Sequence, residues 1–347
     1  MLGITNPYHS FPHRIRRDLP MFDSRAYELN PKHRFVYDKL FIAQSQHIPS
    51  GTFHDLDGTY PIFIKPRWGH KTASSKDCYK ITSYKDLEPH LKKKNMMWSS
   101  FIDAKEGMTD FIIVNGHIVY QLTYEYSEKQ YGFADVWKYI SHENTPPSEI
   151  VEWVEKHMYG YTGPLNVQYR DTFIIEVGLR FGRSGMYIES TKHKVLIDGI
   201  NSMWETKTWD VRETITFEPF YSFKCWSSSP VLCLIPQHIL DALLRYYGAM
   251  DFYEYYFEPT GNTSTVFFQF LHTNIEMGMT LKVIIEWVEW CINTLFKGVI
   301  ALILIGLILD FPVRSFLYTF IALTILSLDN SLFVLKQQVI NQKQLFS

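Results

Sequence analysis

The segment Phe173-Ile174-Ile175-Glu176-Val177-Gly178 holds a single carboxylate within a run of apolar residues. Such a run predicts a buried β-strand. A carboxylate that is buried without a partner is costly in free energy, because burial removes its hydration. We therefore expect Glu176 to pair with a cation or to bind a ligand, and Arg180 is a candidate partner a few residues away.

The residues on either side of this strand predict an α+β fold. A hairpin is expected around Arg170-Asp171-Thr172, and Asn115-Gly116 is a strong signal for a second one. The strands of these two hairpins are residues 165–169 with 173–177, and 111–114 with 117–122. Another strand is predicted at Pro61-Ile62-Phe63-Ile64-Lys65-Pro66. Helices are predicted over residues 33–46 and from residue 146 to about residue 160.

From Met277 onward the chain becomes strongly apolar. Residues 298–309 carry no charge, residues 315–328 carry none either, and Asp310-Phe311-Pro312-Val313-Arg314 separates the two runs. Each run is shorter than the roughly 20 residues of a spanning helix, although the flanking residues can extend it. We expect a hydrophobic helical hairpin that spans or re-enters a membrane, so membrane lipid is an expected partner. A helical pair buried in a protein core is the alternative.

Positive charges around these two runs predict how they are oriented. Lys282, Lys297, Lys336 and Lys343 flank the outer ends of the pair, whereas its loop contains only Arg314. Because cytoplasmic flanks are enriched in Lys and Arg, both ends are expected on the cytoplasmic side. The predicted location is therefore a membrane, with the preceding domain facing the cytosol.

Composition excludes several classes of protein. Of the 347 residues, 46% are hydrophobic and 20% are charged, which allows a sizeable core and argues against disorder. Lys and Arg total 34 against 36 for Asp and Glu, so the charge balance gives no support for nucleic-acid binding. The four cysteines fit no CxxC or zinc pattern, which favours a reducing compartment.

Patterning along the chain predicts four regions. Residues 1–32 are polar and interrupted by prolines, and their basic cluster His13-Arg14-Ile15-Arg16-Arg17 predicts a surface arm. Residues 33–203 form the predicted α+β domain. Residues 204–276 are aromatic and irregular, and we interpret them as an extension of that domain. Residues 277–347 form the predicted membrane-associated helical segment.

Several polar motifs occur in a fixed order through the α+β region. They are Asp38-Lys39, the strand that contains Lys65, the polar loop of residues 67–75, Phe101-Ile102-Asp103-Ala104-Lys105-Glu106, residues 163–168, and residues 174–180. Their order and spacing resemble the ATP-grasp superfamily of carboxylate–amine ligases, over residues 38–183. The resemblance implies an ATP-grasp-like fold of two subdomains, here with a reduced N-terminal domain. It also implies ATP and Mg²⁺ as cofactors, and small-molecule or peptide carboxylates and amines as substrates.

The resemblance also implies a role for each motif. Lys39 and Lys65 would place positive charge on the phosphates, and the loop with Ser74 and Ser75 would close over them. Glu106 would accept hydrogen bonds from the ribose, and Met96-Met97-Trp98-Ser99-Ser100 would be the hinge that packs against adenine. The implied metal ligands are Glu176 and Gln168. The implied catalytic residue is Arg180, which would stabilise charge on the transferred phosphoryl group.

Three departures from the family pattern bear on function. Gly178 stands where the family often has Asn, the phosphate loop contains only Gly69, and the preceding domain is missing or reduced. We predict an ATP-dependent ligase that joins a carboxylate to an amine through an acyl phosphate and is anchored to a membrane. The alternative is a catalytically degenerate ATP-grasp-like binding or scaffold protein of a membrane, such as that of a virus or an organelle.

Overall fold

A computed structural model describes residues 14–56, 58–71, 77–130, 134–227, 235–251, 253–259 and 265–308. The chain divides into two compact units. The first unit comprises His13–Tyr126 and Tyr139–Pro219, and the second comprises Met1–Pro12, Ser127–Lys138 and Phe220–Ser347. The predicted boundary between residues 203 and 204 falls inside a helix, α6 (Lys194–Thr206).

The larger sheet of the first unit contains the stretch around Glu176. Its strands β5 (Glu106–Val114), β6 (His117–Tyr126), β10 (Gly163–Arg170) and β11 (Phe173–Gly178) are antiparallel in the order β11-β10-β5-β6, and β9 (Trp137–Ser141) lies next to β6. Both predicted hairpins are confirmed. At the tip of one of them, Asn115 and Gly116 have φ values of 49° and 86°. Such left-handed residues match the right-handed twist of the strands that they join.

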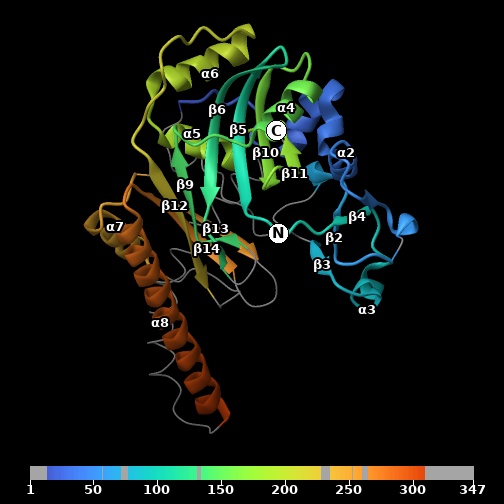
Figure 1. The fold of residues 1–347 in the computed structure, drawn as a ribbon. Coiled ribbons are helices and arrows are strands. Elements are labelled where there is room, and N and C mark those ends of the chain that lie inside the picture. The colour runs from blue at the N-terminus through green and yellow to red at the C-terminus, as the bar shows by residue number, and fades with distance from the viewer. Residues whose placement is uncertain are drawn as a thin grey trace. The chain divides into compact units, whose positions relative to one another are not determined.

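Short helices cover this sheet. Figure 1 shows α2 (Lys39–Gln44) and α4 (Ser148–His157) beside β10 and β11, and α1 (Asp23–Leu29) also contributes to the core there. The helix predicted over residues 33–46 forms in two parts, a 3₁₀ segment (Pro31–Tyr37) and α2. The break falls at Asp38, whose backbone is extended and whose side chain accepts a hydrogen bond from the Leu40 N–H. Asp38 is therefore the N-cap of α2.

A smaller four-stranded sheet forms the other part of the first unit. Its order is β1 (Ser50–Gly51), β4 (Met96–Ser100), β2 (Ile62–Pro66) and β3 (Tyr79–Ile81). The segments around it are 3₁₀ turns at Phe53–Asp55, Gly69–Lys71 and Glu88–His90, and α3 (Tyr84–Leu87). The predicted strand at Lys65 is thus confirmed, and the first unit has two subdomains. Residues 96–100, predicted as the hinge that packs against adenine, form β4, an inner strand with Met97 and Trp98 both buried, and their contact with adenine stays a prediction.

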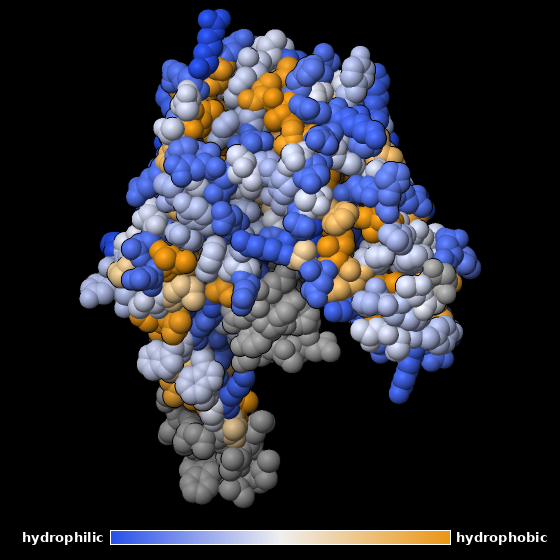
Figure 2. All heavy atoms as spheres, viewed as in Figure 1, coloured by the Kyte–Doolittle hydropathy of each residue, from blue (hydrophilic) through white to orange (hydrophobic). Residues whose placement is uncertain are grey.

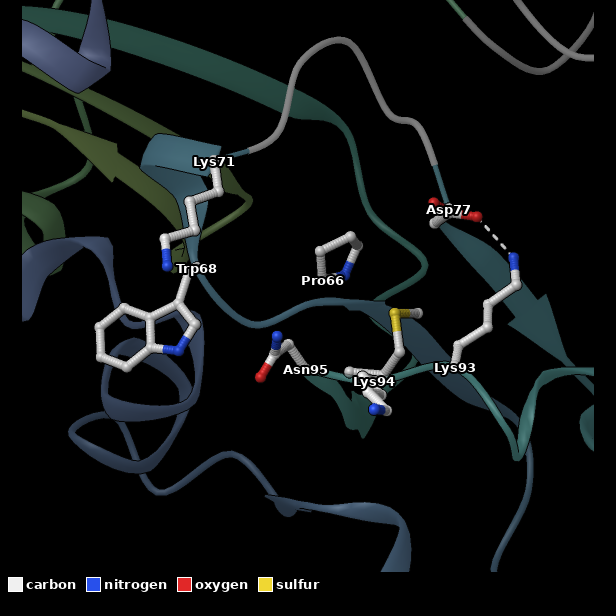
Figure 3. A pocket seen from close by; sticks show the side chains of 8 residues that line it. Pro66, Trp68, Lys71, Asp77, Lys93, Lys94 and Asn95 are labelled. Atoms are coloured by element: carbon white, nitrogen blue, oxygen red, sulfur yellow. Dashed lines mark hydrogen bonds and ion pairs between the residues drawn. The ribbon is translucent and has the colours of Figure 1, made fainter.

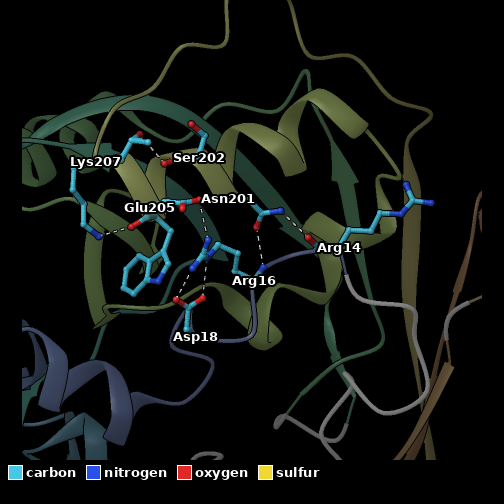
Figure 4. Close-up of polar contacts among 9 residues, drawn as sticks. Arg14, Arg16, Asp18, Asn201, Ser202, Glu205 and Lys207 are labelled. Carbon is cyan, nitrogen blue, oxygen red and sulfur yellow. Dashed lines mark hydrogen bonds and ion pairs between the residues drawn. The ribbon is translucent and has the colours of Figure 1, made fainter.

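The predicted surface arm is also wrong for its described part. Ile15 and Leu19 are each only 2% exposed, because the chain turns these apolar side chains inward between its basic residues. Figure 4 shows this segment against α6, where the Asn201 side chain accepts from the Arg16 N–H and donates to the Arg14 carbonyl. The Arg14 and Ile15 N–H groups donate to Glu189 in α5 (Met186–Ser190), which follows the 3₁₀ turn Gly182–Gly185. The segment is therefore docked by hydrogen bonds and by apolar burial.

The second unit contains regular structure where the sequence suggested irregularity. Strands β12 (Phe220–Ser227), β14 (Thr265–His272) and β13 (Tyr253–Pro259) lie in that order, and β7 (Lys129–Gln130) pairs with β8 (Ala134–Asp135). Two helices, α7 (Gln237–Tyr246) and α8 (Ile275–Ile308), complete the described part. The prediction of irregular structure over residues 204–276 is wrong. Aromatic residues occupy both faces of these strands, so the sequence lacks the alternation of apolar and polar residues that indicates a strand. Phe223 and Phe270, for example, stack 5.3 Å apart in the core.

The apolar C-terminal region enters the described part as the end of α8. Residues 298–308 are helical, whereas the predicted turn at residues 310–314 and the second apolar run at residues 315–328 lie outside the described residues. Among the residues that the structure describes, no helix is both long enough and apolar enough to cross a membrane. The helical hairpin remains a prediction.

Candidate functional site

Lys39 is the first residue of α2 and is almost fully buried. Its Nζ lies 3.1 Å from Glu176 Oε2, and its side chain is only 6% exposed. Its backbone N–H donates to the Arg67 carbonyl, while the Arg67 guanidinium binds both oxygens of Asp38 at 2.7 and 2.5 Å. These contacts join the start of α2 to the end of β2. As a result, Lys39 on the helix and Lys65 on the strand lie near each other.

Lys65 comes from β2 and is also buried. Its Nζ donates to the Ile175 carbonyl at 2.8 Å. Burial lowers the pKa of Lys65 to about 8, and the nearby charge of Lys39 adds to the effect, while Glu176 opposes it. An ammonium group with a lowered pKa among other charges is typical of a ligand-binding site as well as of a structural ion-pair network.

Glu176 lies opposite Gln168 in the register between β11 and β10. Directly opposite residues on antiparallel strands share a face, so the two predicted metal ligands are neighbours. Burial alone would raise the pKa of Glu176, but the ammonium groups of Lys39 and Lys65 hold that pKa below its ordinary value. Glu176 is therefore ionised at neutral pH.

Arg180 follows the end of β11 and binds a residue that the sequence did not indicate. Its Nη2 donates to Asp23 Oδ2 at 2.8 Å, and its Nη1 donates to the Phe181 carbonyl. Burial would lower the pKa of Arg180, but the Asp23 carboxylate raises it above the ordinary value. The ion-pair partner of Arg180 is thus Asp23, whereas Glu176 pairs with Lys39.

Glu106, the predicted ribose ligand, stands at the start of β5. It lies 3.4 Å from the Nη2 of Arg170, and Arg170 also donates to the carbonyl of Ile102 in the connection between the two sheets. Ser74 and Ser75, predicted to cover the phosphates, lie outside the described residues. Among the described residues, β2 of the smaller sheet, β11 of the larger sheet and α2 bring Lys65, Glu176 and Lys39 together.

A cavity of about 390 Å³ lies at the ends of β2 and β4 (Figure 3). The residues lining it are Pro66, Trp68, Lys71, Asp77, Lys93, Lys94, Asn95 and Met96. Pro66 follows Lys65 in the same strand, and consecutive strand residues face opposite sides of a sheet. The cavity therefore lies on the other face of the small sheet from Lys65, and it does not contain the predicted site residues.

Within the described ranges, no group of three or more His, Cys, Asp or Glu side chains could hold a metal ion. Mg²⁺ usually takes one or two carboxylates and completes its shell with phosphates and water. A divalent cation at Glu176 would thus depend on a bound phosphate compound.

No protein-family model matches the sequence, and no curated protein matches it either. Solved structures of ATP-grasp enzymes do resemble it. An L-amino acid ligase from Bacillus licheniformis has a TM-score of 0.53 at 15% identity, covering 76% of this chain and 72% of that one. A carboxyaminoimidazole ribonucleotide synthase from Aspergillus clavatus, complexed with ATP, also has a TM-score of 0.53 at 11% identity, covering 76% and 79%.

A third similar structure is N5-carboxyaminoimidazole synthetase from Staphylococcus aureus, complexed with ADP. It has a TM-score of 0.50 at 14% identity, covering 74% of this chain and 71% of that one. At such low identities, the likeness concerns the fold. The chain has an ATP-grasp-like fold, as its motif order predicted.

Sequence reasoning missed two residues that the fold brings to this site. Asp23 lies in the predicted arm, where no apolar periodicity or motif distinguishes it from its neighbours. Tyr37 is 1% exposed, and its hydroxyl accepts a hydrogen bond from the Leu179 N–H at 3.0 Å. Both residues depend on contacts with the segment after β11, which lies far away in sequence.

Proposed function

We propose that this chain is an ATP-dependent ligase that joins a carboxylate to an amine through an acyl phosphate. The observation that carries the proposal is the convergence of Lys39, Lys65 and Glu176 in a fold similar to that of enzymes complexed with ATP or ADP. Two buried ammonium groups beside one carboxylate leave an excess of positive charge. A polyphosphate would complement that charge.

Each residue would act on a different part of the nucleotide. Lys39 and Lys65 would hold the phosphates, and Glu106 would accept hydrogen bonds from the ribose. Arg180 would face the transferred phosphoryl group and stabilise the charge that develops there. The amine and the carboxylic acid would come from small molecules or peptides.

Glu176 and Gln168 would hold a magnesium ion beside the phosphates of a bound nucleotide. Their side chains share a face, and the lowered pKa of Glu176 keeps that carboxylate charged. Bound magnesium would neutralise charge on the phosphates during transfer. Glu176 also pairs with Lys39, whose ammonium group would contact the phosphates of a bound nucleotide.

The second candidate is a non-catalytic ATP-grasp-like scaffold. The observation that favours it is the set of internal partners: Glu176 pairs with Lys39, Asp23 pairs with Arg180, and the Ile175 carbonyl accepts from Lys65. Such contacts would stabilise the chain without any nucleotide. Binding and turnover measurements separate the two candidates.

Lys65→Met tests nucleotide binding, since it removes the ammonium group but keeps an apolar stem for packing. One charge-assisted contact contributes roughly 1.5–3 kcal/mol, so ATP affinity measured by calorimetry should decrease about 10- to 150-fold. Lys85→Met on exposed α3 is the matched control and should leave the affinity unchanged. An unchanged affinity in folded Lys65→Met would remove the basis of the proposal.

Glu176→Gln tests catalysis, since it keeps the shape of the side chain but removes the charge that magnesium needs. Given ATP, Mg²⁺ and a panel of acids and amines, wild type should release phosphate and Glu176→Gln should not. Nucleotide should still bind to the variant through the two lysines. If wild type binds ATP but shows no magnesium-dependent turnover across amino acids, peptides and amines, the scaffold is the better description.

We also propose that the C-terminal segment anchors the chain to a membrane, with the preceding domain facing the cytosol. Support comes from the arrangement of side chains on α8. Along part of this helix, polar side chains face the protein interior and large apolar side chains face outward. Polar Lys282, Glu289 and Asn293 are buried, with Glu289 accepting from the Ser227 hydroxyl. The outward side chains Val283, Trp287, Trp290 and Leu295 are 57%, 62%, 56% and 70% exposed.

In Figure 2 pale and orange side chains are visible along α8 at the lower left. Large apolar side chains gathered on a surface mark an interaction site, because water solvates them poorly. The two tryptophans suit the headgroup region of a bilayer. The apolar sequence after residue 298 would continue the contact into lipid.

A further inference from the structure

Gly178 leaves room for a side chain from another part of the molecule. A Cβ atom built on Gly178 would lie 2.7 Å from Asp23 Oδ1, which is too close for any real contact. The backbone of Gly178 is not left-handed, so conformation alone does not require glycine here. The space on this face of β11 is therefore taken by the carboxylate of Asp23.

This space lies on the face of the strand that carries Glu176. Residues two apart in a strand point to the same side, so position 178 shares a face with Glu176. Glu176 is the residue that the proposed function assigns to magnesium. Asp23, from a segment near the start of the chain, thus places a second carboxylate on the face of β11 that carries Glu176.

The two oxygens of Asp23 have different surroundings. Oδ2 accepts from the Arg180 guanidinium at 2.8 Å, which fixes the orientation of the carboxylate. Oδ1 is buried and has no hydrogen-bond partner among the described residues. A buried oxygen without a partner is costly, and a bound cation would remove that cost.

α1 holds Asp23 in place from the other side. Asp23 is the first residue of α1, and Ala26 of the same helix is fully buried. Tyr27 stacks on His70 at a centroid distance of 3.7 Å, next to Gly69. A Cβ built on Gly69 would in turn lie 3.4 Å from Glu176 Oε1. Asp23 is therefore anchored to the same loop that borders Glu176.

We infer that Asp23 Oδ1 supplies a protein ligand to the nucleotide-bound divalent cation, in the place that a side chain at position 178 would occupy. This inference rests on the proposed ATP-binding function. A carboxylate oxygen is a suitable ligand for magnesium, and Glu176, Gln168 and Asp23 would together provide three oxygens beside the phosphates. The glycine at position 178 and the carboxylate at position 23 then depend on each other, because the missing side chain at position 178 makes room for the Asp23 carboxylate.

Asp23→Asn tests the assignment without removing the partner of Arg180. The guanidinium needs an oxygen acceptor, so the amide NH₂ would occupy the position of Oδ1, where it cannot bind a cation. The Mg²⁺ concentration that half-saturates the gain in ATP affinity should rise at least about tenfold. ATP affinity without divalent cations should change less than about twofold, because the lysines are untouched.

Mn²⁺ provides a readout independent of activity. Electron paramagnetic resonance of Mn²⁺ with ATP and protein should show weaker ternary binding for Asp23→Asn. The matched control is Asp18→Asn, which removes a carboxylate that pairs with Arg16 in the same N-terminal segment. This control should match wild type in both measurements.

A second variant restores a ligand from the strand itself. Gly178→Asn alone should weaken cation binding, because its side chain collides with Asp23. Asp23→Ala combined with Gly178→Asn removes the collision and should recover at least part of the magnesium dependence that Asp23→Ala loses. Recovery would support a shared cation position, even if the single variants are less stable.

The outcomes separate the inference from the proposed function. If wild type shows magnesium-dependent ATP binding and folded Asp23→Asn shows the same dependence, Asp23 only neutralises Arg180 and the inference is overturned. If wild type shows no affinity for ATP with or without Mg²⁺, the proposed function and this inference are both overturned.

Discussion

Three features of Lys65 bear on its charge. Its ammonium group is buried, it donates to the neutral carbonyl of Ile175, and it lies near the positive charge of Lys39. Both the burial and the like charge favour the neutral amine. At pH values near or above 8, the lysine can therefore gain a proton when a negative ligand binds.

Proton uptake on ATP binding follows from the lowered pKa of Lys65. At pH 8 about half of the Lys65 side chains are neutral in the free protein, and bound phosphates would raise the pKa again. Binding at pH 8 should therefore take up about half a proton, and affinity should fall as pH rises above 8. Calorimetry in two buffers of different ionisation enthalpy measures the uptake.

Lys65→Met gives the control for this prediction. Its proton uptake at pH 8 should fall towards zero, and wild type should show little uptake by this lysine at pH 6.5, where it is already protonated. Equal proton counts for wild type and Lys65→Met at pH 8 would show that another group is responsible.

Part of the candidate site could be predicted from residue patterns alone. Glu176 could be singled out because a carboxylate in an apolar strand needs a partner, and the structure places Lys39 beside it. The roles of these residues remain predictions. Asp23 could not be found in the same way, because its partner Arg180 is 157 residues away and the local sequence carries no mark of that contact.

The elements with strong local signals are the ones that the sequence predicts. The tight turn at residues 115 and 116 requires two left-handed residues, and Asn-Gly is one of the few pairs that readily adopts this conformation. The hairpin predicted from this pair is confirmed. The strands β12 and β14 have no such signal, since buried aromatic residues occupy both of their faces. The helix over residues 33–46 was predicted without its break, because Asp38 caps α2 through contacts that periodicity does not reveal.

Two glycines of α8 form a matched pair for testing how this helix packs. A Cβ on Gly278 would lie 2.1 Å from the ring of Phe223, which is fully buried against Phe270. Gly278→Ala should therefore lower the free energy of unfolding by about 1–3 kcal/mol through overpacking. Urea unfolding followed by circular dichroism measures the change.

Gly298 lies in the same helix, and no atom of the described residues lies within 4 Å of such a Cβ. Gly298→Ala should be neutral or stabilising by up to about 1 kcal/mol, because alanine favours the helix. Equal effects at the two positions would mean that α8 does not approach β12 as closely as described.

At the scale of the whole molecule, the membrane proposal has a well-defined test. A chain that ends at Lys297 keeps Asn293 and the buried contacts of α8 but lacks the apolar runs. The full chain should sediment with membranes and be released only by detergent, while the shortened chain should stay in the supernatant. A cut at Lys282 would be less suitable, because it removes Glu286, which accepts from the Trp226 N–H.

ATP affinity of the shortened chain serves as the control for its folding. It should equal that of the full chain, since Lys39, Lys65 and Glu176 all belong to the first unit. If both chains remain in the supernatant without detergent, the apolar runs are core helices and the membrane proposal is wrong.

The hairpin of β10 and β11 also determines when the site can first exist during synthesis on the ribosome. Lys65 reaches its acceptor across 110 residues, Tyr37 reaches Leu179 across 142, and Asp23 reaches Arg180 across 157. Contacts so distant in sequence form late, because a long stretch of chain must be ordered before they are made. Until residue 180 has left the ribosome, the early lysines of a nascent chain have no carboxylate to pair with, and a nucleotide has no complete site to enter. Nucleotide binding and the last step of folding in the first unit are therefore expected to coincide.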